Sequence, residues 1–371
     1  MMNRTFFRAV LPLLLCAVLC LPCASPAAAS GTWLTFTEKT VPENMGFLVQ
    51  EYTGTVTITF LGDCTLGGEE KTRTATRGFF RIVEKNGYEY PLRNLKVLTG
   101  SDDFTVANLE GVLSDQELPK VRKQYNFMGP TAYTEILKQG SVECVTLANN
   151  HSHDYDNAGY ADTVKALEAS GTAWFGTDSM AVWQNDDGLK IGFLGVSGSL
   201  SGRKAKIYQR QAALLRTIGC SAIITVMHAG TEYDPIPDGY QKQIVREAIA
   251  GGSSLIIGHH PHIVQGFELS GGIPVVYSLG NCSFGGNGNP KDHDALVVRV
   301  DLRFTEGELS GMTLHFYPIS VSGQASYNDY SPVLLTGEDA ERVLRKMKDS
   351  TGVEMPPFDE KEGSVVTVRV R

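Results

Sequence analysis

The sequence predicts a layered α/β protein in which two β-sheets pack against each other. Between about residues 55 and 257, short apolar runs typical of strands alternate with segments of helical periodicity. From residue 263 to residue 319 the strand-like runs follow one another without an intervening helix. Alternating strands and helices are typical of a parallel sheet, whereas consecutive strands favour antiparallel pairing. We therefore expect the later strands to form a second sheet on the first.

The expected elements follow in a regular order. The first firm strand has alternating character and ends at Gly62-Asp63, and residues 67–78, rich in Gly, Lys, Arg and Thr, are interpreted as a surface loop. Gly251-Gly252 is expected to end a helix. The strands are expected at residues 55–61, 104–107, 144–148, 190–196, 222–227, 255–257, 263–269, 275–279, 295–304, 312–319 and 365–370, and the helices at 158–170, 207–218, 241–250 and 337–348.

The first 29 residues have the pattern of a secretory signal peptide. Arg4 and Arg8 precede a short apolar run, and Ala27-Ala28-Ala29 offers a cleavage site. The run is too short to span a bilayer comfortably, so an uncleaved anchor is the alternative rather than the first interpretation. We expect a signal peptide at 1–29, a lead-in without strong periodicity at 30–53, the main domain at 54–320 and a C-terminal helix and strand extension at 321–371. The mature protein is expected to be extracytoplasmic, either secreted or associated with the cell envelope.

The charge of the chain bears on its binding partners, and the spacing of its cysteines bears on disulfide formation. The chain has a formal net charge of −8, and loss of Arg4 and Arg8 with the signal peptide would bring it to about −10. Such a surface does not favour nucleic acid or another polyanion. The cysteines outside the signal peptide show neither paired spacing nor a zinc-binding pattern, and we expect them to be reduced and buried: Cys64, Cys144, Cys220 and Cys282.

Histidines provide the main functional signal. Six of the eight histidines lie in three short segments, and each segment directly follows an expected strand: His151 and His153, His228, and His259, His260 and His262. Two further strand ends carry Asp63 and the pair Asn108 and Glu110. Ligands of open α/β sheets bind at the carboxyl ends of the strands. Five strand ends therefore direct carboxylate, amide and imidazole groups toward one rim.

This mixture of side chains is suited to divalent metal ions. Imidazole and carboxylate together bind Mn, Fe or Zn, and two such ions about 4 Å apart can bind a phosphoryl group and activate water. We expect one or two ions, with Glu110 as the candidate bridge and His151 facing the substrate as a general acid or a stabiliser of the transition state. The expected ligands are Asp63, Glu110, Asn150, His228, His260 and His262.

Structural roles are the alternative for several of these residues. Asp63, Asn149 and Asn150 could be turn residues, and Asp154 could cap the helix that follows it. His153 lies in a polar loop where a solvated role is at least as plausible. Other catalytic classes are disfavoured because the Gly-rich stretches lack the residues of a phosphate-binding loop and no GxSxG motif is present.

Several of these residues occur in motifs that resemble a known family. In order they are Gly62-Asp63, Ala107-Asn108-Leu109-Glu110-Gly111, Asn149-Asn150-His151 with Asp154, His228 with Glu232-Tyr233, Gly258-His259-His260-Pro261-His262, and Ser278-Leu279-Gly280-Asn281. This series resembles the CapA family of poly-γ-glutamate capsule synthesis proteins, within the calcineurin-like metallophosphatase superfamily. The resemblance implies a four-layer αββα sandwich with a two-metal centre. It also implies catalytic roles for His151 and Asp154, and substrate-binding or ligand-supporting roles for Asn108, Asn149, Glu232, His259 and Asn281.

The resemblance leaves two functions open. One is a metal-dependent hydrolase of a phosphoester, or less readily of an amide, in the cell envelope. The other is a non-catalytic scaffold that holds poly-γ-glutamate or a capsule-synthesis membrane protein. The chain departs from the family at three places: Asp63-Cys64-Thr65 lacks the usual Asp-x-His histidine, and Ala229 and Cys282 stand where Trp and Phe are usual. We expect the last two to widen or reshape the pocket.

Overall fold

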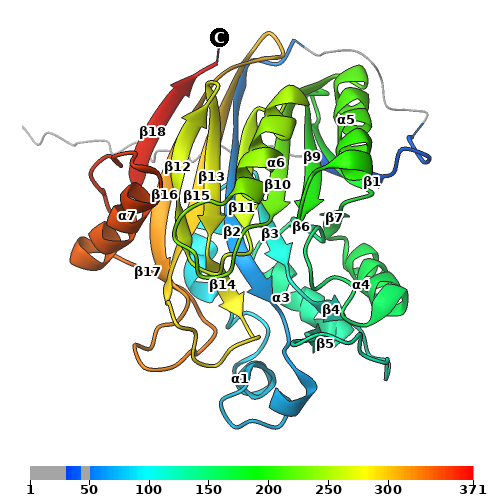
Figure 1. Ribbon diagram of the computed structural model, residues 1–371, viewed down its shortest axis with the longest axis vertical. Coiled ribbons are helices and arrows are strands. Elements are labelled where there is room, and N and C mark those ends of the chain that lie inside the picture. The colour runs from blue at the N-terminus through cyan, green and yellow to red at the C-terminus, as the bar shows by residue number, and fades with distance from the viewer. Residues whose placement is uncertain (1–30, 43–50, 371) are drawn as a thin grey trace, which may run out of the picture.

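The computed structural model describes residues 31–42 and 51–370. The expected signal peptide therefore lies outside the described residues. Two large sheets pack face to face, and helices cover the outer face of each, so that the predicted four-layer αββα sandwich is confirmed (Figure 1). Among the described helices, none is long and apolar enough to cross a membrane.

The first sheet is built from the middle of the chain. Its three central strands are parallel to one another, and a further parallel neighbour, β13, joins them to the antiparallel edge strand β12. Its order across the sheet is β1 (Gly31–Phe36), β8 (Met180–Asn185), β9 (Lys190–Ser197), β10 (Cys220–His228), β11 (Leu255–His259), β13 (Ile273–Leu279) and β12 (Val264–Ser270).

The second sheet combines strands from both ends of the chain. The parallel strands β2, β3, β6 and β7 are continued by the antiparallel strands β15 and β16. The order is β17 (Val333–Leu334), β16 (Glu308–Ser320), β15 (Asp294–Thr305), β2 (Gly54–Thr65), β3 (Phe104–Leu109), β6 (Cys144–Thr146) and β7 (Ala173–Phe175), with β14 (Asn281–Phe284) on β2 and β18 (Ser364–Arg369) on β16.

One expectation about this architecture was wrong. The late strands do not make a sheet of their own: β12 and β13 join the first sheet, while β15 and β16 extend the second sheet from β2. Apolar periodicity shows that a strand is buried but not which strand it pairs with, and this explains the error. The lead-in at 30–53 also contains a strand, β1, which pairs antiparallel with β8 at the edge of the first sheet.

Helices complete the outer layers. On the first sheet lie α5 (Gly202–Thr217) and α6 (Gly239–Ala250), and a cluster of buried apolar residues from both helices and the sheet joins them. The second sheet is covered by α1 (Phe79–Asn86), α2 (Lys96–Thr99), α3 (Thr134–Gln139) and α4 (Asp156–Ser170). The short strands β4 (Val112–Leu113) and β5 (Met128–Gly129) pair beside α4.

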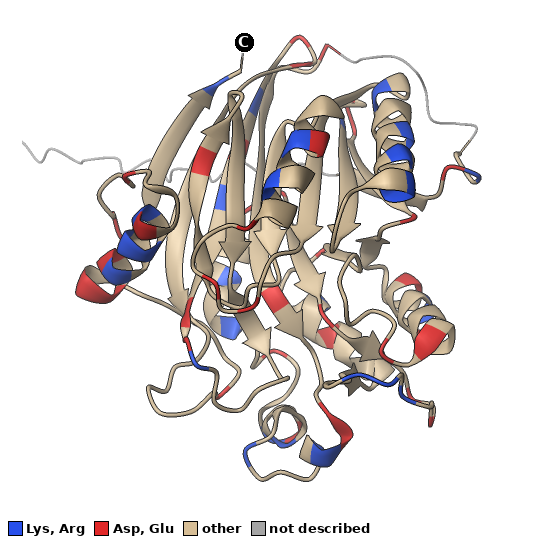
Figure 2. Ribbon diagram, viewed as in Figure 1, with Lys and Arg blue, Asp and Glu red and all other residues tan. Residues whose placement is uncertain are grey.

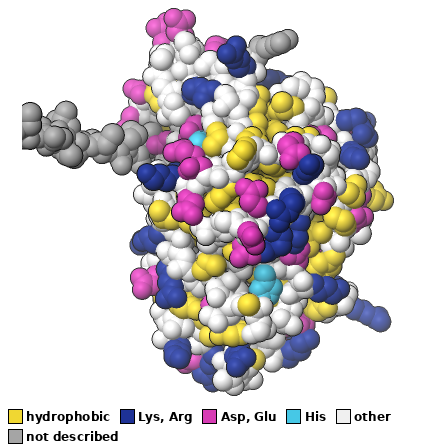
Figure 3. Space-filling view, turned by 90° about the vertical axis from the view of Figure 1, so that its left-hand side faces the viewer, with side chains coloured by type: hydrophobic (Ala, Val, Ile, Leu, Met, Phe, Trp, Pro, Cys, Tyr) yellow, Lys and Arg dark blue, Asp and Glu magenta, His cyan; other side chains and the backbone are white. Residues whose placement is uncertain are grey.

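The core between the sheets follows from strand periodicity. Side chains of a strand alternate between its two faces, so Val56, Ile58 and Phe60 of β2 all point into the space between the sheets. The expected C-terminal elements are present as α7 (Gly337–Thr351) and β18, and α7 adds Val343 and Met347 to the same core. Basic and acidic side chains are interspersed on the face seen in Figure 3.

Candidate metal centre

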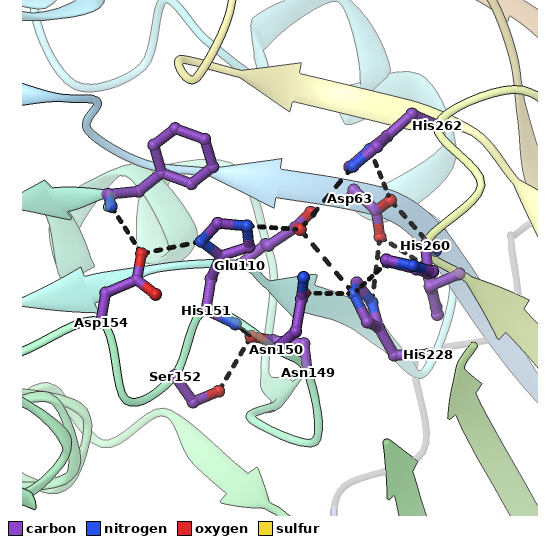
Figure 4. A network of polar contacts seen from close by, with 12 residues as sticks. Asp63, Glu110, Asn149, Asn150, His151, Ser152, Asp154, His228, His260 and His262 are labelled. Carbon is purple, nitrogen blue, oxygen red and sulfur yellow. Dashed lines mark hydrogen bonds and ion pairs between the residues drawn. The ribbon is translucent and has the colours of Figure 1, made fainter. Parts of the chain in front are cut away.

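The predicted site residues converge where the two sheets present the carboxyl ends of their parallel strands (Figure 4). The second sheet contributes Asp63 near the end of β2, Glu110 directly after β3, and Asn150 in the turn after β6. The first sheet contributes the remaining predicted ligands, which lie at the end of β10 and in the turn after β11: His228, His260 and His262. The structure therefore brings all six predicted ligands together.

Asp63 is fully buried and surrounded by nitrogen atoms. Its Oδ1 accepts a hydrogen bond from Asn108 Nδ2 at 2.7 Å and lies 3.3 Å from His259 Nδ1. Its Oδ2 lies 3.3 Å from His262 Nδ1. Burial alone would raise the pKa of Asp63, but the hydrogen bonds to His259 and His262 hold it well below its ordinary value. Asp63 is therefore an ionised carboxylate in the interior.

Glu110 has a buried carboxylate that a bound cation would stabilise. It is fully buried, and both of its carboxylate oxygens lack a hydrogen-bond partner among the described residues. Oε1 lies 3.7 Å from His228 Nε2, 3.7 Å from His151 Nε2 and 3.9 Å from His262 Nε2. Burial, and then the charge of Asp63, raises the pKa of Glu110 well above its usual range. A buried carboxyl without partners is costly, and a bound cation would remove that cost.

The imidazoles around Glu110 are close to one another. His228 Nε2 lies 2.8 Å from Asn150 Oδ1 and 3.1 Å from His260 Nδ1. Burial lowers the pKa of both His228 and His260, which favours the neutral ring that binds metal. Burial would also lower the pKa of His262, but Glu110 and Asp63 outweigh it and raise that pKa to about 10. The two carboxylates thus favour positive charge at this position.

Two groups of three side chains have ligand atoms close enough to share an ion. In each group the three atoms lie within 4.8 Å of one another: one group is Asp63, Glu110 and His262, and the other is Glu232, His260 and His262. Glu232 was predicted only to support the ligands or contact substrate, and its carboxylate lies instead among the ligand candidates. These oxygen and nitrogen donors suit Mn, Fe or Zn. The residues present therefore fit the implied metal ions.

The backbone that carries the histidines is strained. His260 has φ of +100° and His262 has φ of +57°, a region that residues other than glycine rarely adopt. Such strain persists only where the surrounding structure imposes it, and it is concentrated at functional sites. In this conformation the His262 ring faces Asp63 and Glu110, while His260 donates its backbone N–H to Asp63 and places its ring against His228 (Figure 4).

His151 lies beside the ligands and is held by Asp154. Its Nδ1 lies 2.7 Å from Asp154 Oδ2, the ring of Phe127 stacks on it at 4.4 Å, and the Phe127 N–H donates to the same Asp154 oxygen at 2.6 Å. Burial lowers the pKa of His151, although Asp154 opposes the change. The capping alternative for Asp154 was wrong, because the carboxylate faces His151 and the residue before α4, Tyr155, makes no side-chain cap.

The remaining predicted residues connect the ligands to one another. Asn149 Nδ2 donates to Asn108 Oδ1 at 2.9 Å, and Asn149 Oδ1 accepts from the His151 N–H at 2.9 Å. Asn281 Oδ1 lies 2.9 Å from His262 Nδ1. Sequence reasoning missed Lys123, whose Nζ lies 2.5 Å from Asp154 Oδ1. No sequence signal could have found it, because it comes from the loop between β4 and β5 and belongs to no motif.

Comparison with known proteins identifies the family of this chain. Residues 57–285 match the sequence model of a family described as "Bacterial capsule synthesis protein PGA_cap". The chain belongs to this family. It is 25% identical over 308 residues to the capsule biosynthesis protein CapA of Bacillus anthracis, covering 76% of this chain and 71% of that protein. It is 24% identical over 265 residues to the PGA biosynthesis protein CapA of Bacillus subtilis (strain 168), covering 66% and 67%. The predicted resemblance to CapA is confirmed.

Two recesses open beside the candidate metal centre of this CapA-family chain. The Tyr240 recess, of about 320 Å³, is lined by Tyr240, Asn150, His228, His260, Ser197 and Ala229. The Lys291 recess, of about 630 Å³, is lined by Lys291, Tyr233, Glu232, His151, His262 and Tyr125. Ala229 lines the Tyr240 recess. The expectation for Cys282 was wrong: it is fully buried in the core beside Cys64 and lines neither recess.

Proposed function

We propose that this chain is an exported, metal-dependent hydrolase that acts in the biosynthesis of a poly-γ-glutamate capsule. Its place in capsule biosynthesis is supported by the family and by the names of the two Bacillus relatives. Export is supported by the signal-peptide pattern of residues 1–29. The four free cysteines of the described chain suit a protein that does not depend on disulfides.

The unpartnered carboxylate of Glu110 carries the hydrolase proposal. A fully buried carboxyl group whose two oxygens make no hydrogen bond destabilises the fold unless a ligand binds it. Imidazole nitrogens of His228, His151 and His262 surround it at 3.7–3.9 Å. A cation held among these groups would balance the buried carboxylate and could also bind substrate.

The residues of the site would have three different roles: metal binding, proton donation and orientation of the proton donor. The six predicted ligands together with Glu232 would hold one or two divalent ions, which supply Lewis acidity to a phosphoryl or acyl group. His151 would donate a hydrogen bond or a proton to the leaving oxygen, since it lies beside the ligands and borders the Lys291 recess. Asp154 would orient the His151 ring through Nδ1, leaving Nε2 to face the substrate.

Metal analysis followed by a substrate panel tests the proposal. Protein purified without chelator should contain between one and two Mn, Fe or Zn ions per chain. It should hydrolyse at least one member of a panel of phosphomonoesters, phosphodiesters and γ-glutamyl amides. Replacing His260 and His262 together by Ala should lower the metal content sharply. N-terminal sequencing of the protein from the extracytoplasmic fraction should find a chain that begins near Ser30.

A specific result would contradict each part of the proposal. An unchanged metal-to-protein ratio in the double variant would place the metal elsewhere. Bound metal without turnover of any panel member, in a protein that cells still need to produce capsule, would favour the non-catalytic scaffold. An intact Met1 in the membrane fraction would contradict cleavage of the signal peptide.

A further inference from the structure

The two recesses border the same group of candidate metal ligands. Consecutive residues lie on opposite sides: Asn150 borders the Tyr240 recess and His151 the Lys291 recess. His260 likewise borders the Tyr240 recess and His262 the Lys291 recess, and their rings are 6.0 Å apart. Glu110 Oε1 lies between the sides, 3.7 Å from His228 and 3.7 Å from His151. A ligand at the centre can therefore extend in both directions.

A lysine is available on one side of the centre. Lys291 is exposed, and its Nζ lies 4.7 Å from the centroid of the Tyr233 ring. Within the described part of the chain it makes no ion pair. Two carboxylates share this recess, but Glu232 is a candidate metal ligand and Glu69 is paired with Lys71 at 2.8 Å. Lys291 can therefore receive an anionic group of a ligand.

A basic helix begins on the other side. Lys204 Nζ donates to the carbonyl oxygen of Ser197, a residue that borders the Tyr240 recess, at 3.3 Å. Lys204 belongs to α5, which has no acidic residue and five basic ones, and the blue bands of this helix stand out in Figure 2. Its first turns expose Arg203, Lys204 and Lys206. In a chain of net charge −8, this is a local concentration of positive charge.

We propose that an internal segment of poly-γ-glutamate lies across the metal centre, with carboxylates at Lys291 on one side and at Arg203 and Lys206 on the other. The identity of the polymer rests on the proposed function. Its path, from one recess across the centre to the other, is inferred from the positions of the recesses and the cations. The acidic protein as a whole repels a polyanion, so a bound chain is confined to the places where cations offset that repulsion. Tyr233 and Tyr240, both exposed, provide the walls of the path.

Binding of a γ-linked glutamate oligomer with both ends capped tests this path. Isothermal titration calorimetry of the metal-containing protein should give similar affinity for the capped and the uncapped oligomer, and much weaker affinity for glutamate itself. Lys291→Gln and the double variant Arg203→Gln/Lys206→Gln should each weaken binding on the order of tenfold, and combining them should multiply the losses. The matched control Lys165→Gln/Arg345→Gln removes two exposed helical cations away from the recesses and should change affinity little.

Three outcomes would overturn the path. Binding of the uncapped oligomer alone would mean that the site captures a chain end. Loss of affinity in only one of the two variants would mean that the polymer approaches from one side. Failure of both oligomers to bind a protein that contains metal and cleaves a phosphoester would reject the polymer while leaving the hydrolase intact. Failure of the proposed function itself would appear separately, as a protein that holds no metal or that turns over no member of the substrate panel.

Discussion

His151 is fixed from several directions, although it contributes no ligand of its own to the predicted set. Asp154 holds its Nδ1, Phe127 stacks on its ring, and Asn149 accepts the hydrogen bond of its backbone N–H. Lys123 then pairs with the second oxygen of Asp154 at 2.5 Å. These contacts hold the ring in one orientation, as is required of a side chain that presents a defined nitrogen to a substrate.

His151→Ala should separate catalysis from metal binding. The metal content and thermal stability should stay near those of the wild type, because the ring is not among the two groups that can share an ion. Hydrolysis of any accepted substrate should fall by at least ~100-fold, the usual contribution of a general acid. Full activity in this variant would reject His151 as the acid.

His153 offers a matched control two residues away. It is exposed and stacks on Tyr160 with ring centroids 4.6 Å apart, on the surface of α4. His153→Ala should therefore leave the steady-state hydrolysis rate and the metal content unchanged, which shows that losing a histidine from this turn is not itself harmful.

Among the elements, β11 has the tightest constraint on the site. It pairs in parallel with β13, and a side chain at Gly258 would bring its Cβ to 1.9 Å from the carbonyl oxygen of Tyr277. Only glycine permits this approach. The strained turn with His260 and His262 begins two residues later, so the close contact sets the position from which both imidazoles project.

Gly258→Ala should therefore weaken both the fold and the metal centre. Forcing the strands apart should lower the free energy of unfolding by roughly 1–3 kcal/mol, as overpacking does, and metal content should fall in the same preparation. Gly239→Ala, at the first residue of α6 where a Cβ meets nothing within 4 Å, should change stability by less than about 1 kcal/mol. Chemical denaturation and metal analysis of both variants check this. Equal stability and equal metal content in the two variants would show that the close contact at Gly258 does not determine the position of the histidines.

At the scale of the whole molecule, the candidate metal centre draws its residues from both sheets. Asp63, Glu110 and Asn150 come from the second sheet, whereas His228, His260 and His262 come from the first. An ion shared by these residues would connect the layers at one edge of the sandwich. Because unfolding of either sheet would destroy such a site, the ion should stabilise both together.

Chelation should therefore lower the melting temperature of the entire domain. An ion present at about 100 times its Kd stabilises a fold by about 2.7 kcal/mol. Removing it should lower Tm by roughly 5 °C in differential scanning calorimetry. In Glu110→Gln, which keeps the shape of the side chain but not its charge, Tm should respond little to chelator. An equal response in the two proteins would mean that the chelated ion binds outside the centre.

Local pattern predicted the four longest described helices and most of the long strands, although it missed α1 and β8, and it predicted most of the candidate site. The period-two alternation of Val56, Ile58 and Phe60 reports burial directly, and each strand that ends in Asp, Glu, Asn or His carries its own signal. The carboxyl ends of parallel strands meet at one edge of a sheet, so the predicted gathering of these residues follows from local sequence and a general rule.

Strand pairing and side-chain contacts between distant segments were visible only in the tertiary structure. Apolar periodicity does not encode a partner, and so it could not place β15 and β16 beside β2 or divide the late strands between two sheets. Lys123 reaches Asp154, and Glu232 reaches His260 and His262, only because separate loops fold over the same edge. The lack of hydrogen-bond partners at Glu110 is likewise a property of three-dimensional packing, since a sequence shows a carboxylate but not what surrounds it.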